Sequence, residues 1–119
     1  MAVHAMLKSL NLDPEPSELP ADPASFCTHA TMYVGPPDSL GHETFQLTVC
    51  SAEWLAAQTR EVGILDARHH LIVDFDSFDQ RRLRTWLEER VSGLSGASWS
   101  DVGEKLGRLG YWEFEDYQE

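Results

Sequence analysis

Two alternating segments joined by a turn constrain the fold of this chain more than any other feature. In residues 26–34, every second position is apolar apart from Thr28. After the turn sequence Gly-Pro-Pro-Asp-Ser-Leu-Gly, a second alternation runs through residues 44–50. This pattern is typical of two half-buried strands that form an antiparallel hairpin.

The side chains also select the register of the hairpin. Setting Met32 opposite Phe45 and Ala30 opposite Leu47 gathers the large apolar side chains on one face, and a shift by one residue would scatter them. The same register places Cys27 opposite Cys50 on the other face, with His29 two residues along. We therefore expect one face of the hairpin to lie against the core.

The remaining strands and helices are predicted from shorter signals. Residues 3–10 favour a strand, and a proline-rich stretch follows at residues 13–22. Ser51 is a suitable N-cap for a short helix that ends before Gly63. A third long strand is expected over residues 68–75, in which Leu71, Val73 and Phe75 share a face.

The C-terminal half predicts two further helices. Residues 77–80, Ser-Phe-Asp-Gln, have the spacing of a capping box. The apolar stripe of the helix that follows consists of Leu83, Trp86, Leu87, Val91 and Leu94. Ser98 or Ser100 can cap the next helix, which we expect to stop at Gly110. Gly103 and Gly107 have no side chain and therefore allow close packing of the helix. In the last segment, Trp112 and Phe114 are expected to point inward.

The order of these elements predicts an α+β fold in a single domain over residues 1–119. Its mostly antiparallel sheet should contain about four to five strands, with about three helices packed on one face. A chain of 119 residues suits one hydrophobic core, and 42% apolar residues supply the material for it.

The charge of the chain limits its partners. Twenty acidic residues against nine basic ones give a net charge of −11, which opposes binding to nucleic acid or to an anionic membrane. Only one of the nine basic residues, Lys8, lies within residues 1–59. The expected partner of such a surface is a basic surface on another protein.

No apolar run approaches the length of a membrane span, and the N-terminal residues lack the pattern of a secretory signal. We therefore expect a cytoplasmic protein with reduced cysteines. The sequence leaves open whether Cys27 and Cys50 pair.

Few residues suggest catalysis or metal binding. The adjacent residues His69 and His70 point to opposite faces of a strand and cannot act on one substrate together. Cys27, His29 and Cys50 offer three metal donors without the spacing of a known zinc module. No phosphate-binding loop or nucleophile elbow is present. We predict no catalytic residue, metal or cofactor, and the alternative is a small hydrolase or metal-dependent enzyme that uses His29, His70 and Asp74.

The acidic, aromatic C-terminal segment is the stronger candidate surface. If Trp112 and Phe114 anchor the segment, the intervening acidic residues project outward together with Tyr111, Tyr117 or both. An edge rich in aromatic and charged side chains is typical of protein interfaces. The predicted partner-binding residues are Tyr111, Glu113, Glu115, Asp116 and Tyr117.

Three segments carry a family resemblance. They are residues 68–73 (Arg-His-His-Leu-Ile-Val), the Ser98-Trp99 helix start with Lys105–Gly110, and the block Trp112–Tyr117. Together they resemble the immunity protein 8 family of bacterial polymorphic-toxin antidotes. The resemblance implies a cytoplasmic protein that binds and blocks a toxin encoded beside it. It assigns no toxin-contact residues. A basic toxin, such as a nuclease, would suit the charge of this chain, whose oligomeric state the sequence does not predict.

Overall fold

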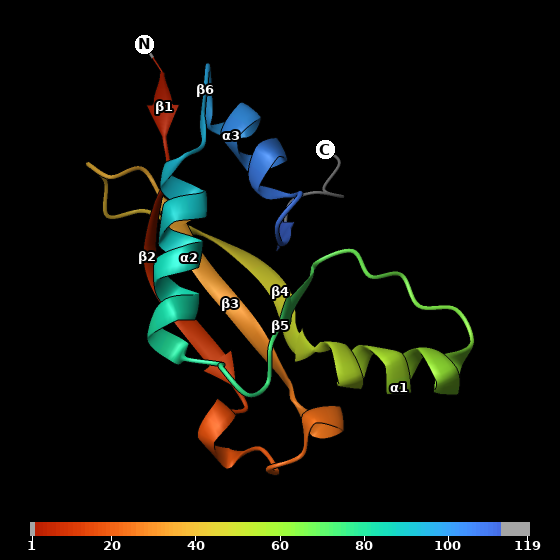
Figure 1. Cartoon of the computed structure of the whole chain (residues 1–119). Helices are drawn as coiled ribbons and strands as arrows, with labels where there is room; N and C mark the ends of the chain where they lie inside the picture. Colours follow the sequence, from red (N-terminus) through yellow and green to blue (C-terminus); the bar gives the residue numbers. More distant parts are fainter. Residues whose placement is uncertain (1, 113–119) are drawn as a thin grey trace.

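The computed structural model describes residues 2–112 of the 119-residue chain (Figure 1). Its strands are β1 (Val3–His4), β2 (Met6–Asp13), β3 (Cys27–Gly35), β4 (Glu43–Ser51), β5 (His70–Val73), β6 (Ser95–Gly96) and β7 (Tyr111–Trp112). Its helices are α1 (Ala52–Val62), α2 (Gln80–Ser92) and α3 (Trp99–Leu106), with 3₁₀ turns η1 (Pro16–Glu18) and η2 (Pro23–Ser25) between β2 and β3.

A five-stranded sheet forms the centre of the molecule. Its strands lie in the order β2-β3-β4-β5, and β7 pairs with β4 as well. β5 runs parallel to β4, while the other pairs in this sheet are antiparallel. β1 and β6 form a separate antiparallel ribbon. The predicted α+β fold with a mostly antiparallel sheet is therefore confirmed.

The predicted hairpin register is confirmed. Met32 pairs with Phe45 and Ala30 with Leu47, and these side chains are buried on one face of the sheet. α2 and α3 pack their apolar stripes onto that face. Their fully buried members are Leu83, Leu87, Val91, Val102 and Leu106.

Two buried hydroxyl groups attach the proline-rich segment to the end of the hairpin. Thr28 Oγ1 donates to the carbonyl oxygen of Pro14 at 2.5 Å, and Ser51 Oγ donates to that of Pro23. Both side chains are fully buried, so these bonds also satisfy hydroxyls that would otherwise be costly to bury.

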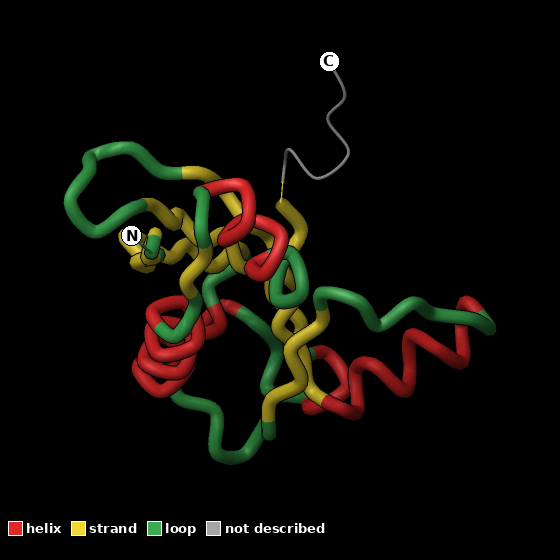
Figure 2. The backbone as a smooth tube through the Cα atoms, turned by 90° about the horizontal axis from the view of Figure 1, so that it is seen from above, coloured by secondary structure: helices red, strands yellow, loops and turns green. Residues whose placement is uncertain are grey.

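Ser51 has a second role as the predicted N-cap of α1, because its Oγ accepts from the backbone N–H of Trp54 at 3.0 Å. α1 ends at Val62 before Gly63, which has a φ of +83°, a conformation that favours glycine. No residue of α1 is fully buried, and the helix extends away from the sheet (Figure 2).

The segment around β5 differs from the long strand predicted over residues 68–75. β5 has only four residues, because His69 before it adopts a left-handed φ of +62° and the chain turns after Val73. The predicted capping box is wrong. Asp79 caps α2 by accepting from Arg81 N–H at 2.9 Å, and Ser77 instead donates its hydroxyl to Asp74 at 2.7 Å.

α3 begins with Ser98 as its N-cap and ends at Leu106 with Gly107 as its C-cap, three residues before the predicted stop at Gly110. The close approach predicted for Gly103 is confirmed: a Cβ there would lie 2.6 Å from Cη2 of Trp112. The strand predicted over residues 3–10 is divided between two sheets: β1 pairs with β6, while β2 begins at Met6, pairs with β3 and continues to Asp13.

Trp86 differs from its predicted place in the core. Its side chain is 42% exposed, whereas its neighbour Leu87 is fully buried. The stripe of α2 that faces the sheet is therefore narrower than its apolar residues suggest. Trp86 instead contacts the guanidinium of Arg90, 5.6 Å from its ring centre.

We expect Leu87→Ala to lower the free energy of unfolding by about 2–5 kcal/mol, because it leaves a cavity in the core. Trp86→Ala should cost about 1 kcal/mol, since its side chain already contacts solvent. Urea denaturation of both variants measures the difference. Equal losses would contradict the exposed position of Trp86.

Cys27 and Cys50 lie directly opposite each other and are free thiols. Burial raises the pKa of both. That of Cys50 rises from its usual 9.0 to about 11, with a smaller contribution from the charge of Cys27. The folded chain therefore holds the Cys50 proton at a pH where the unfolded chain has lost it.

Stability should consequently fall as the pH rises from about 9 towards 11, since deprotonation then favours the unfolded chain. In Cys50→Ala this fall should be shallower, because the thiol is gone. Urea denaturation of both proteins at a series of pH values provides the test. Parallel profiles would show that Cys50 does not contribute.

Candidate functional site

The outer edge of β4 is shared by two short strands from distant parts of the chain. β7 pairs with it at Phe45 and Gln46, and β5 pairs with it from Thr48 to Ser51. The segment predicted to bind a partner therefore begins next to the start of β5. We call this side of the sheet, formed by β5 and β7, the β5/β7 edge.

His69 connects the two strands. Its Nε2 lies 2.7 Å from the carbonyl oxygen of Gly107, and its ring lies 6.2 Å from that of Tyr111. A carbonyl can only accept, so Nε2 carries the hydrogen in this contact. The His69 side chain is half-buried, and the residue precedes β5 instead of lying in the strand predicted over residues 68–75.

A single carboxylate fixes the start of β7. Glu43 Oε2 accepts from Nε1 of Trp99 at 2.6 Å and from Nε1 of Trp112 at 3.0 Å. The Trp112 ring also stacks on Phe45, with ring centres 5.9 Å apart. Trp112 thus points inward as predicted, and the alternation of a strand turns Tyr111 to the other face.

Tyr111 is the one predicted partner-binding residue that the structure describes, and its side chain is 39% exposed. It lies at a shallow hollow of about 500 Å³ on the face opposite the core. Other side chains that line the hollow are His29, Gln46, Thr48, Arg68 and His69. Glu113, Glu115, Asp116 and Tyr117 lie outside the described residues, as does Phe114.

The residues of the enzyme alternative do not form a site. Thr48 pairs with both His29 and His70, so the two histidines are separated by two strand spacings, about 10 Å. The carboxylate of Asp74 accepts from Ser77 N–H and Oγ instead of a histidine. His70 Nδ1 contacts the carbonyl of Arg68, and its ring stacks on Trp54.

The three candidate metal donors weighed in the sequence also differ in their surroundings. Cys50 is fully buried, Cys27 is half-buried and His29 is exposed. Within residues 2–112, no group of three or more His, Cys, Asp or Glu side chains is arranged to hold a metal ion. No helix in the same range has both the length and the apolar character needed to cross a membrane.

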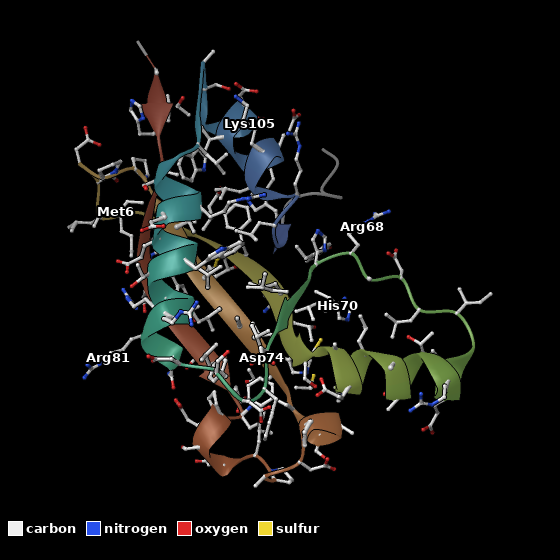
Figure 3. The ribbon with its side chains drawn as sticks, viewed as in Figure 1. Met6, Arg68, His70, Asp74, Arg81 and Lys105 are labelled. Atoms are coloured by element: carbon white, nitrogen blue, oxygen red, sulfur yellow. The ribbon has the colours of Figure 1, made fainter. Side chains whose placement is uncertain are left out.

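Exposed carboxylates gather at the end of the molecule where β5 finishes. We call this region the acidic end; it comprises Asp13, Glu15, Glu18 and Asp22 from one segment and Asp74, Asp76 and Asp79 from another. The buried ring of Phe26, four residues after Asp22, packs against the second segment, since it lies 5.9 Å from the ring of Phe75 and 4.9 Å from that of Phe78. Figure 3 shows Asp74 at this end and Arg81 on the neighbouring helix.

A groove of about 330 Å³ runs between β5 and α2, next to the acidic end. Its apolar lining includes Leu71, Val73, Phe78, Leu83 and Trp86. This groove was not predicted from the sequence. The signal in the sequence was the apolar stripe of α2, which is wider than the sheet can cover, but a stripe alone does not show which of its residues stay exposed.

The model of one protein family, described as immunity protein 8, matches residues 5–117 of the chain. No curated protein and no solved structure matches it. The match includes the segments on which the resemblance rests, namely β5, α3 and the residues after Tyr111. The chain therefore belongs to the immunity protein 8 family, whose members are immunity proteins of polymorphic toxin systems.

Proposed function

We propose that this immunity protein binds its cognate toxin directly and occludes the active cleft of the toxin with an acidic surface. The family implies a toxin partner. The observation that supports an acidic contact is the acidic end, whose seven exposed carboxylates lie in two segments that contain no lysine or arginine. Such a surface attracts a basic partner and speeds the encounter.

The proposed partner is a basic toxin domain, and a nuclease is the class that fits best. Clefts that bind nucleic acid carry positive charge to hold phosphates, so a compact anionic protein can fill them. This action needs a rigid complementary surface and no chemistry by the immunity protein itself. We place it in the cytoplasm, where the toxin would meet the nucleic acids of the cell.

The C-terminal edge is the proposed second part of the contact. It comprises Tyr111, Glu113, Glu115, Asp116 and Tyr117. The exposed ring of Tyr111 supports this role, because half-exposed tyrosines contribute strongly to protein interfaces. The carboxylates of Glu113, Glu115 and Asp116 in the C-terminal edge add to the negative charge of the acidic end.

The first test is co-expression with the toxic C-terminal domain of the protein encoded beside this chain. We expect growth to be rescued, and the two purified proteins to form a complex whose association slows as salt is added. Titration calorimetry and stopped-flow kinetics measure both effects. Full toxin activity in the presence of excess immunity protein would contradict the proposal.

Charge reversal tests the C-terminal edge. Glu115→Lys combined with Asp116→Lys should slow association with the toxin and weaken its dependence on salt, because both changes act on long-range attraction. The control is the double variant Asp38→Lys with Glu61→Lys, which makes the same change of net charge at exposed positions elsewhere. Equal association rates for the two double variants would place the contact away from the edge.

A further inference from the structure

We propose that the free edge of β5 and the groove beside it bind an extended, basic segment of the cognate toxin. The segment pairs with β5 as an additional strand, places one large apolar side chain in the groove and directs its basic side chains to the acidic end. This inference rests on the proposed function and specifies the surface that performs it.

The first observation is the position of β5. Among residues 2–112 it pairs only with β4, so its other side is an edge of the sheet. In a parallel pair, the backbone groups of alternate residues point away from the neighbouring strand. The register aligns Val49 with Leu71 and Cys50 with Ile72. Thr48 N–H donates to the carbonyl oxygen of His69, so the backbone groups of His69 and of every second residue after it point towards β4. The backbone N–H and C=O of Ile72 therefore point away from β4, towards the open edge.

Sheet edges of this kind are recognised by extended segments that add a strand. Proteins commonly protect such edges with a charged side chain or a proline. β5 has neither, since its four residues are His, Leu, Ile and Val, and the side chain of Ile72 is 43% exposed. The edge is therefore open and apolar.

The second observation is the groove. Leu71 and Val73 form one wall from β5, and Leu83 and Trp86 form the other from α2. A strand added to β5 would carry alternate side chains towards α2, where the groove lies. Its volume of about 330 Å³ suits one large side chain. The half-exposed Trp86 is the type of residue that contributes most to binding once a partner covers it.

The third observation is charge, which selects the chemistry of the partner. Asp74 and Asp79 line the groove with a single cation, Arg82, and Asp76 lies in the loop between the two aspartates. The carboxylates of residues 13–22 continue this negative surface past Phe26. A lysine- or arginine-bearing segment therefore fits the groove and its surroundings better than a neutral or acidic one.

Two variants test the groove against the cognate toxin domain. Trp86→Ala removes a groove wall, and we expect at least a tenfold higher Kd, mainly through faster dissociation. Asp76→Lys should slow association several-fold and weaken its salt dependence. The matched controls are Leu40→Ala, which removes a side chain that is 99% exposed, and Asp38→Lys. Both controls lie in the loop between β3 and β4 and should bind like the wild type.

Hydrogen exchange tests the strand pairing independently of substitution. In the complex, the amide of Ile72 should exchange at least tenfold more slowly than in the free protein, while amides of α1 should change little. Thermal unfolding of Trp86→Ala checks that the variant is folded. A loss of binding by a folded Trp86→Ala together with protection of Ile72 would support the inference.

The outcomes separate this inference from the proposed function. If the wild type protects cells from the toxin and both groove variants bind it as well as their controls, the groove is not the contact, although the immunity function stands. If the wild type neither binds nor blocks the toxin, both proposals are wrong. A toxin-free dimer that protects Ile72 and dissociates in Trp86→Ala would identify a second copy as the occupant and overturn the inference.

Discussion

The register of the β3–β4 hairpin is the constraint on which the rest of the structure depends. It sets Met32 and Phe45 against the helices and leaves the polar alternation on the other face. It also fixes the two ends of β4. Glu43 at one end binds the indoles of Trp99 and Trp112, and Ser51 at the other end caps α1. A slip by one residue would turn the large apolar side chains away from the core and move Glu43 away from the two indoles.

The two candidate contact regions are consequences of how the outer edge of β4 is completed. β7 covers one part of that edge and β5 covers another, so neither short strand hides the whole side of the sheet. Tyr111 lies at one end of the β5/β7 edge and Asp74 at the other. One partner can therefore meet an aromatic side chain, an open strand and a negatively charged end along a single line.

Local signals predicted the parts of the fold that depend on neighbouring residues. The hairpin register, the Ser51 cap and the Ser98 cap all follow from alternation or from one hydroxyl beside a helix start. Asp79 caps α2 in place of the predicted Ser77, because the hydroxyl of Ser77 donates a hydrogen bond to Asp74. The capping pattern did not indicate this contact within the turn. His69 shortened β5 through a left-handed backbone conformation that no residue pattern indicated.

The site depends on contacts between distant residues, which is why less of it could be predicted. Tyr111 and Trp112 alternate as expected, but the carboxylate that holds Trp112 comes from Glu43, far away in the chain. Parallel pairing of β5 and the exposure of Trp86 likewise depend on which elements meet in space. Periodicity shows that a face is apolar, whereas only the packed structure shows how much of it remains uncovered.

The attachment of residues 13–25 allows their chemistry to change independently of the scaffold. Thr28 and Ser51 hold this segment through the main-chain oxygens of Pro14 and Pro23, and the side chains of Glu15 and Glu18 take no part in the attachment. If the acidic end contacts the toxin as proposed, replacing such surface residues would alter which toxin is recognised while the framework stays intact. When the toxin changes in evolution, the immunity protein could then change its surface residues in response with little loss of folding stability.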